Sequence, residues 1–368
     1  MSKPQVVVYG ASGYTGKLIA EYLAKRGISF IAAGRSESRL KAELGKVPFV
    51  DRVEVQYAAL EHTVEALTEL FLGVKVVINV VGPFAQLGRE VVQACLSAGA
   101  HYLDTTGEQD WVIDCKAEYG QTFADKKLVL APATSWMWNA GLLAAEVALE
   151  TSGIDSLDIV YAPNGNPSPA STKSFLRMCC QPQLKLELNK FQPWPQATAY
   201  EATVPGFHQH LLALPWSGGC EPVWYADDER VQNCSVLTAF TNRPMMELVV
   251  AKMKEFADLA PTLSAKEQEE LTNAWGESIC STEPPREIEE INRVVISCWA
   301  RGNTTVKHVV FFNTCGYLQT GVMAAELADR LLRNQHKRVG FTSAVHAVGH
   351  RELIAACAEE GMHCWEPA

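Results

Sequence analysis

The sequence lacks a basic stripe, low-complexity tracts and a paired-cysteine metal motif. Its 368 residues carry 32 Lys+Arg against 42 Asp+Glu, a formal net charge of −10, and charged residues make up only 20% of the chain. Nonspecific nucleic-acid binding needs Lys and Arg against the phosphates, so we expect no nucleic-acid partner. Gly and Pro are spread along the chain and 48% of residues are apolar, which excludes a disordered or collagen-like protein. The length allows two or three domains.

Cysteine is too sparse for a disulfide scaffold. The eleven cysteines include no Cys-x-x-Cys, and the adjacent pair Cys179-Cys180 is not a zinc signature. The histidine pairs 208/210 and 346/350 lack a third ligand at a recognisable spacing. We therefore expect no metal site, and reduced thiols in a cytoplasmic protein.

An apolar signal core is also missing, because residues 1–4 lead directly into a strand pattern. One segment, Leu128 to Leu149, carries a single charge, Glu146, and is long enough to span a bilayer. Pro132 and Asn139 lie inside it, and it divides into a short strand, a turn and the start of a helix. We expect no membrane span.

Short apolar runs alternate with amphipathic segments through the first 150 residues. The expected strands are 5–9, 30–33, 53–55, 76–81, 101–103 and 128–130. A helix is expected directly after Gly16 and closed by Gly27, and further helices are expected at 37–44, 62–72, 89–98 and 111–123. Such alternation predicts an α/β fold, a Rossmann-type doubly wound parallel sheet.

The pattern changes after residue 150. Strands are expected at 156–161, 235–241, 294–301 and 305–312, the last two joined as a hairpin around Gly302-Asn303, with an amphipathic helical region over 245–277. Further helices are expected at 322–332 and 352–360. We predict a Rossmann domain over 1–150, an inserted α+β domain over 151–317 for substrate or dimerisation, and C-terminal helices over 318–368 that pack back on the first domain.

A glycine-rich loop separates the first strand from the first helix, the context that a dinucleotide fingerprint requires. Gly10 permits the tight turn, Gly13 admits a pyrophosphate, and Gly16 lets the helix pack close to the strand. The GxxGxxG spacing favours a 2′-phosphorylated cofactor. The residues expected to bind the cofactor here are Gly10, Ser12, Gly13, Tyr14, Thr15 and Gly16.

The end of the second strand selects the cofactor. An acidic residue there would hold the ribose of NAD, whereas this strand ends in Gly34, Arg35 and Ser36, with Arg39 one helical turn later. A guanidinium and a hydroxyl suit a 2′-phosphate, so we predict NADP(H). Ser36 also suits the role of a helix cap.

The fourth and fifth strands end over the crevice where a nicotinamide would lie. Expected cofactor contacts at these ends are Asn79, Val81, Gly82, Pro83, Phe84 and Thr106. For Thr106 and Asp104, helix capping and ligand contact are equally good interpretations.

Four motifs then resemble a known family. Residues 6–16 (VVVYGASGYTG), 33–35 (AGR), 80–84 (VVGPF) and 102–108 (YLDTTGE) look like the saccharopine dehydrogenase-like oxidoreductases, in the branch that includes trans-acting enoyl reductases. The segments 340–344 (GFTSA) and 349–353 (GHREL) are similar to that branch as well. The resemblance implies NADP(H)-dependent hydride transfer and a domain inserted between Rossmann segments. Relatives usually carry a Gly-Phe-Asp turn where this chain has Ser-Trp-Met-Trp-Asn at 135–139, so the resemblance does not identify the substrate.

Catalytic side chains are harder to assign. Neither the Tyr-x-x-x-Lys pair of short-chain dehydrogenases nor a Gly-x-Ser-x-Gly elbow is present. The segment 194–224 is rich in Trp, Tyr, Phe and His, which favours either a core or the wall of an apolar pocket. We take His208 as the candidate proton donor and Tyr317 as a second polar group.

These observations predict an NADP(H)-dependent oxidoreductase that reduces a C=C or C=N bond of an unsaturated carbonyl or imine with an apolar or aromatic body. One alternative is a saccharopine- or opine-type dehydrogenase of amino-acid conjugates, although the inserted domain offers few cations for carboxylates. Another is an NADP sensor without turnover. We also predict a homodimer formed through the strands 294–301 and 305–312.

Overall fold

The computed structural model describes residues 3–366, which divide into two compact units. Unit 1 contains the described residues up to Thr106, Trp111–Trp136 and Tyr317–Glu360. Unit 2 contains Gly107–Asp110, Met137–Gly316 and the described residues from Gly361 onward. The sequence predicts domain ends at 150 and 317, whereas the chain passes from unit 1 to unit 2 after residue 136 and back to unit 1 after residue 316. The described residues from Gly361 onward belong to unit 2 again.

Unit 1 is built on a parallel sheet that has seven strands within the described residues, in the order β15-β6-β5-β4-β1-β2-β3. This is the predicted doubly wound arrangement, with β15 from the C-terminal segment added beside β6. Its strands are β1 (Val6–Tyr9), β2 (Phe30–Gly34), β3 (Val55–Ala59), β4 (Val76–Asn79), β5 (His101–Asp104), β6 (Val129–Ala131) and β15 (Gly340–Phe341).

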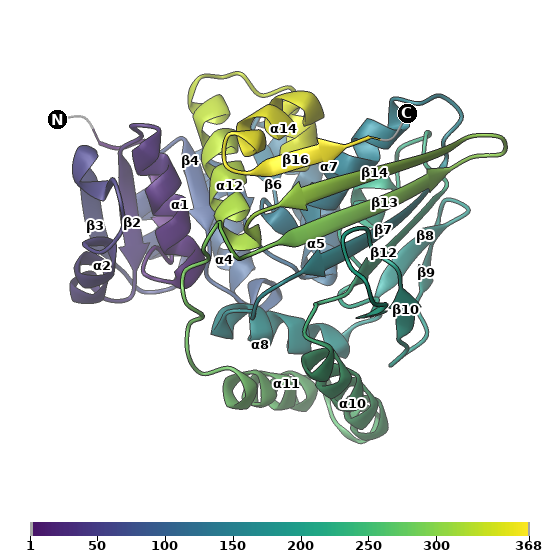
Figure 1. Cartoon of the computed structure of the whole chain (residues 1–368). Coiled ribbons are helices and arrows are strands. Elements are labelled where there is room, and N and C mark those ends of the chain that lie inside the picture. Colours follow the sequence, from purple (N-terminus) through teal and green to yellow (C-terminus); the bar gives the residue numbers. More distant parts are fainter. Residues whose placement is uncertain (1–2, 367–368) are drawn as a thin grey trace. The chain divides into compact units, whose positions relative to one another are not determined.

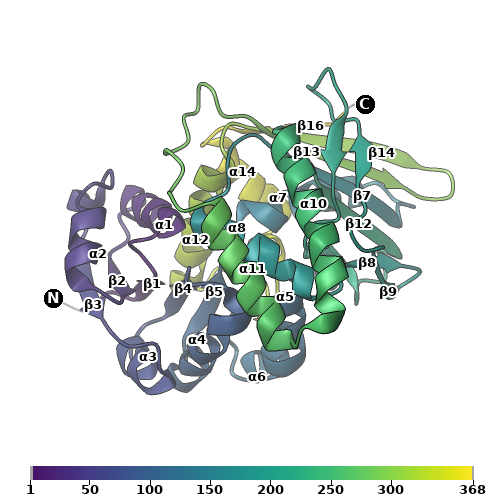
Figure 2. The same ribbon diagram turned by 90° about the horizontal axis from the view of Figure 1, so that it is seen from below.

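Helices cover both faces of this sheet, as its fully apolar central strands require. In Figure 2, α3, α4 and α6 lie along one side, and α1 and α12 lie along the other. Gly321 of α12 allows close packing on α1, since a Cβ there would lie 2.6 Å from the Tyr22 ring. The helices are α1 (Tyr14–Lys25), α2 (Glu37–Leu44), α3 (Val64–Phe71), α4 (Phe84–Ala98), α5 (Gln109–Asp114), α6 (Gly120–Asp125), α12 (Gly316–Leu332), α13 (Ala344–Val348) and α14 (His350–Ala358).

The helix expected over 111–123 is interrupted. A π-helical turn at Cys115–Tyr119 separates α5 from α6. Short 3-10 turns occur at Val50–Arg52, Met178–Cys180 and Ala260–Thr262.

Unit 2 contains a mixed sheet, with seven strands among the described residues in the order β16-β14-β13-β7-β12-β8-β9 (Figure 1). The predicted hairpin is confirmed: β13 and β14 pair antiparallel, Arg301 opposite Val306. Val204, Leu211 and Ala213, from the segment that holds β10 and β11, pack into one apolar cluster with residues of the sheet. The strands are β7 (Ser156–Pro163), β8 (Leu184–Glu187), β9 (Lys190–Pro193), β10 (Tyr200–Ala202), β11 (Leu211–Ala213), β12 (Asn233–Thr238), β13 (Val294–Arg301), β14 (Val306–Asn313) and β16 (Met362–Trp365).

The helical region expected over 245–277 forms two helices. Pro261 lies in the connecting turn, and Ser264 starts the second helix with a capping box to Glu267. Gly276 of that helix packs against Lys173 of α8, 2.8 Å from where its Cβ would lie. The helices of unit 2 are α7 (Trp136–Leu149), α8 (Pro169–Arg177), α9 (Glu221–Tyr225), α10 (Arg243–Leu259) and α11 (Ala265–Ile279).

The apolar segment 128–149 forms β6, a turn and α7, as the sequence predicts. Across residues 3–366, none of the helices has both the length and the apolar character that crossing a membrane requires.

Candidate functional site

The glycine loop between β1 and α1 depends on two of its glycines for its shape. Gly10 has φ +93°, and a Cβ there would lie 2.9 Å from the side chains of Val80 and Val81. At Gly16, a Cβ would lie 2.5 Å from the carbonyl oxygen of Gly10. Larger residues at either position would push the helix or the neighbouring strand end away from the loop.

Gly13 is different, because the fold itself tolerates a side chain there. Its φ is −80°, and its Cβ would make only an ordinary 3.4 Å contact with the Gly10 oxygen. Gly13 is the N-cap of α1, and no described side chain caps this helix end. The partial positive charge of a helix N-terminus favours a phosphate. The loop therefore fits the pyrophosphate of a dinucleotide, with Ser12, Tyr14 and Thr15 beside it.

The end of β2 carries two exposed cations. Arg35 and Arg39 form no ion pair with any residue in the described part of the chain, whereas Glu37 is paired with Lys41 at 2.6 Å. Ser36 follows Gly34 and caps α2, its Oγ accepting a hydrogen bond from the Arg39 amide at 3.3 Å. With no uncompensated carboxylate beside them, these guanidinium groups suit a 2′-phosphate.

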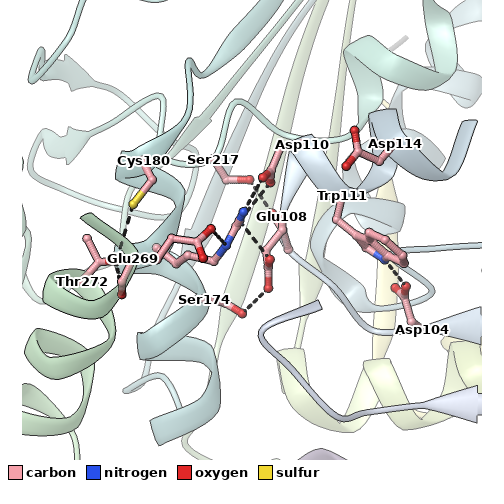
Figure 3. Close-up of polar contacts among 12 residues, drawn as sticks. Asp104, Glu108, Asp110, Trp111, Asp114, Ser174, Cys180, Ser217, Glu269 and Thr272 are labelled. Atoms are coloured by element: carbon pink, nitrogen blue, oxygen red, sulfur yellow. Dashed lines mark hydrogen bonds and ion pairs between the residues drawn. The ribbon is translucent and has the colours of Figure 1, made fainter. Parts of the chain in front are cut away.

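Asp104, at the end of β5, connects the ends of two strands, β5 and β6, and the helix α5. Its Oδ1 accepts hydrogen bonds from the backbone amides of Thr106 (3.0 Å) and Ala133 (2.8 Å). Its Oδ2 accepts from the Tyr102 hydroxyl at 2.8 Å. The same oxygen accepts from Trp111 Nε1 at 2.8 Å (Figure 3). Burial raises the pKa of Asp104, while these donors oppose that rise. The carboxyl group therefore orders the loops that follow β5 and β6 rather than facing solvent.

Asn79 and Thr106 are fully buried as well. Asn79 Oδ1 accepts from the Val81 amide at 3.0 Å, and its Nδ2 donates to Tyr102 at 3.3 Å. Val81, Gly82 and Pro83 are half-buried, and Phe84 begins α4. The residues predicted to contact the cofactor thus lie together at the carboxyl ends of β1, β2, β4 and β5. Most of the polar groups at these ends are backbone amides and carbonyls.

Unit 2 contains a buried charge cluster around Arg177, whose side chain is 3% exposed. Its guanidinium pairs with Glu108 at 3.1 Å, Asp110 at 2.6 Å and Glu269 at 3.5 Å. Figure 3 shows these three carboxylates around the guanidinium, with Ser174 donating to Glu108 at 2.7 Å. Sequence reasoning missed this cluster; the available signal was a carboxylate, Glu108, ending the motif at 102–108.

The two candidate catalytic side chains belong to different units. His208 is exposed in the loop between β10 and β11 of unit 2. Tyr317 is half-buried in unit 1, and its ring packs edge-on against Tyr14, 4.9 Å between centroids. Tyr317 therefore lies beside the glycine loop.

The aromatic segment of unit 2 contributes to both a core and a cavity. Trp216 is buried and donates its Nε1 to the Phe175 carbonyl at 2.9 Å. It also lines a cavity of about 450 Å³ between α8, α10 and the residues that follow α11. Lining residues include Thr172, Leu176, Met245, Val249 and Lys252.

All eleven cysteines fall within residues 3–366 and are free thiols. In the same range, no three His, Cys, Asp or Glu side chains gather as metal ligands would. His210 Nδ1 instead lies 3.0 Å from the Thr203 hydroxyl.

Two family models match the chain. The model described as "Saccharopine dehydrogenase NADP binding domain" matches residues 6–124, and the model described as "Family of unknown function (DUF5938)" matches residues 139–366. The first match confirms the predicted resemblance, and NADP(H) is the cofactor that this domain takes.

Three curated relatives show how far the similarity extends. A Caenorhabditis elegans "lipid droplet localized protein" is 35% identical over 37% of this chain and 34% of its own length. A "putative trans-acting enoyl reductase" of Mycobacterium tuberculosis is 39% identical over 28% of this chain and 25% of its own. The human "saccharopine dehydrogenase-like oxidoreductase" is 26% identical over 48% of this chain and 42% of its own. The chain thus matches between a quarter and about two fifths of these relatives.

Proposed function

Because this chain belongs to the DUF5938 family and begins with an NADP-binding domain of the saccharopine dehydrogenase type, we propose that it is an NADP(H)-dependent oxidoreductase. The observation that carries the proposal is the loop over 10–16, where a side chain at Gly13 would fill space that the fold leaves open. Bound NADP(H) supplies or accepts the hydride. The chain's own residues bind and orient it.

The ends of the strands in unit 1 contact different parts of the cofactor in this proposal. The amino end of α1 and the backbone around Gly13 hold the pyrophosphate, and Arg35 and Arg39 hold the 2′-phosphate. The hydrogen bonds of Asp104 hold the ends of β5 and β6 in place, which keeps the crevice preorganised. Tyr317 has better support than His208 as a catalytic polar group, because Tyr317 packs on the cofactor loop.

For the substrate, we favour a C=C or C=N bond in an unsaturated carbonyl or imine with an apolar or aromatic body. Two lines support this choice: relatives that carry the name trans-acting enoyl reductase, and the cavity of unit 2, whose wall includes Leu176, Trp216 and Met245. The cavity's 450 Å³ falls in the usual range for small-molecule pockets.

The alternative of an amino-acid-conjugate dehydrogenase requires cations that are available for substrate carboxylates. Four cations of the inserted domain, Lys173, Arg177, Arg230 and Arg243, are each paired with carboxylates of the protein itself. The pairs are Lys173–Glu277, Arg177 with Glu108, Asp110 and Glu269, Arg230 with Glu146 and Asp228, and Arg243 with Glu201 and Glu247. This pairing favours an apolar substrate.

The predicted homodimer and the cytoplasmic location are part of the proposal. Free thiols throughout residues 3–366 suit a reducing compartment. The β13–β14–β16 patch, which we define as Trp299, Val306, Phe312 and Trp365, exposes large apolar side chains on one sheet and supports self-association.

The test is turnover of NADPH by the purified chain with a panel of enones and imines, including imino acids. We expect NADPH oxidation with apolar enones or imines. Gly13→Val is the control: it should lose NADPH binding yet keep its thermal unfolding temperature, because its backbone φ suits valine and the loop has room. Turnover of imino acids alone would favour the amino-acid alternative, binding without any turnover would indicate a sensor, and failure of the wild type to bind NADPH would overturn the proposal.

A further inference from the structure

Glu221 is a buried carboxyl group without a cationic partner. It is the first residue of α9 in unit 2, and it is 0% exposed. No Lys, Arg or His pairs with it in the described part of the chain. One of its oxygens, Oε2, has no hydrogen-bond partner among the described residues. An ionised carboxylate in such a place would cost several kcal/mol.

Its other oxygen, Oε1, lies 2.6 Å from the hydroxyl of Tyr161 on β7. That hydroxyl also lies 2.6 Å from the carbonyl oxygen of Trp138 and accepts the Gly141 amide at 2.7 Å. A hydroxyl carries one proton and accepts at two lone pairs. It therefore cannot donate to both the Trp138 carbonyl and a carboxylate.

All three short contacts of the Tyr161 hydroxyl can be hydrogen bonds only if the Glu221 carboxyl group is protonated. Tyr161 then donates to Trp138, and accepts from the Gly141 N–H and from the Glu221 O–H. We infer that Glu221 is a neutral carboxylic acid in the folded protein and that its hydrogen bond to Tyr161 stabilises the irregular start of α7. Burial also raises the pKa of Glu221 to about 8, although hydrogen bonds with Tyr161 and with the backbone amides of Glu221 and Cys220 oppose that rise.

The hydrogen bonds of Glu221 and Tyr161 stabilise a helix start that departs from regular geometry. Met137 and Trp138 have non-helical φ/ψ values within α7. In a regular helix the Gly141 amide would donate to the carbonyl of Met137, four residues earlier; here it donates to Tyr161. Gly141 also provides the space, because a Cβ there would collide with Glu221 Oε1 and the Tyr161 hydroxyl.

The titratable groups near Glu221 do not supply a countercharge. Cys220 precedes it, Tyr161 faces it from β7, and Cys234 and Cys298 lie on β12 and β13. Burial raises the pKa of Tyr161, Cys234 and Cys298, so these three groups are neutral near pH 7.

Charged groups on the adjoining elements pair with one another instead. Glu146 of α7 accepts from Tyr225 at 2.9 Å and pairs with Arg230. On β8, Lys185 pairs with Glu187 at 2.9 Å.

The proposal predicts a direction of pH dependence. An unfolded glutamate has a pKa of about 4.3, and the folded one is higher, so the folded state holds one proton more than the unfolded state between these values. The contribution of Glu221 to the free energy of unfolding is fully present below the pKa of the unfolded state, and it is lost as pH rises to about 8. Above that pH both states are ionised and the loss levels off.

Glu221→Gln tests this inference, because its amide N–H replaces the acid O–H toward Tyr161 and does not titrate. We expect the folding equilibrium constant of the wild type, divided by that of Glu221→Gln, to fall about tenfold per pH unit between pH 5 and pH 8 and then to stay constant. Urea unfolding measured at intervals from pH 5 to pH 9 gives this ratio. The exposed Glu270, changed to Gln, is the matched control and should follow the wild type.

A ratio that does not change with pH, or that rises with pH, would overturn the inference. Infrared difference spectra of the folded proteins keep the test decisive if Glu221→Gln is unstable. The wild type at pH 6 should show the carbonyl band of a protonated carboxylic acid, which disappears above pH 9 without unfolding. Absence of that band at pH 6 would also overturn the inference.

Discussion

At the residue scale, we propose that the choice between NADPH and NADH depends on Arg35. It is exposed at the end of β2, forms no ion pair within residues 3–366, and has Ser36 and Arg39 as neighbours. A hydrogen bond to a charged group contributes roughly 1.5–3 kcal/mol. That corresponds to about 10- to 150-fold in affinity.

We expect Arg35→Asp to weaken NADPH binding at least about tenfold, since a carboxylate also repels the 2′-phosphate, and to leave NADH binding unchanged or improved. Fluorescence titration of both cofactors measures the ratio. Arg338→Asp makes the same charge change at another exposed position of unit 1 and should not alter the ratio. An NADPH/NADH ratio in Arg35→Asp equal to that of the wild type would refute the assignment.

At the element scale, Arg177 joins α8 to α11 and to residues 107–110 within unit 2. Its three carboxylate partners are tolerated in one place only because the guanidinium neutralises part of their charge. Breaking a buried ion pair from one side leaves charge without compensation and costs about 3–5 kcal/mol.

Arg177→Met should therefore lower the free energy of unfolding by about 3–5 kcal/mol at pH 7. The deficit should shrink as pH falls, because the buried Glu108 would lose its cation and a buried carboxyl group without a cation is accommodated better when protonated. Urea unfolding at pH 7 and pH 5 measures both effects. Arg301→Met removes an exposed pair with Asp158 and should cost about 1 kcal/mol at most. Equal losses for the two variants would contradict this account of the cluster.

At the scale of the whole molecule, the β13–β14–β16 patch supports the proposed homodimer. Trp299 is 49% exposed and stacks on His308 at 3.8 Å, and Trp365 is 47% exposed on the edge strand β16. Strand register places Trp299, Val306, Phe312 and Trp365 on the same face of the sheet. Large exposed aromatic side chains on one sheet face commonly mark an interface.

Trp299→Asp should shift the protein from dimer to monomer in light scattering at micromolar concentration, since a carboxylate would be buried at the interface. Ile291→Asp changes another exposed apolar residue of unit 2, outside the patch, and should remain dimeric. A wild type that is monomeric at this concentration would count against the dimer.

Local patterns in the sequence were sufficient to predict much of unit 1 and one hairpin of unit 2. Buried β-branched runs, glycine spacing and capping residues act over a few neighbours, so the parallel sheet, the glycine loop and the hairpin of β13 and β14 followed from them. The same locality explains the errors. The sequence periodicity from 245 to 277 continues through Pro261, but the chain turns there and starts a new helix at Ser264.

The sequence by itself determined the class of fold and the cofactor, because the residues that indicate them are adjacent in the chain or lie at neighbouring strand ends. Only the tertiary structure decided the environments of Glu108, Asp104 and Glu221. Arg177 lies 69 positions from Glu108, and Tyr161 lies 60 positions from Glu221. Burial and hydrogen-bond count, which arise when distant segments pack, determine whether a carboxyl group there is a structural anion or a neutral acid.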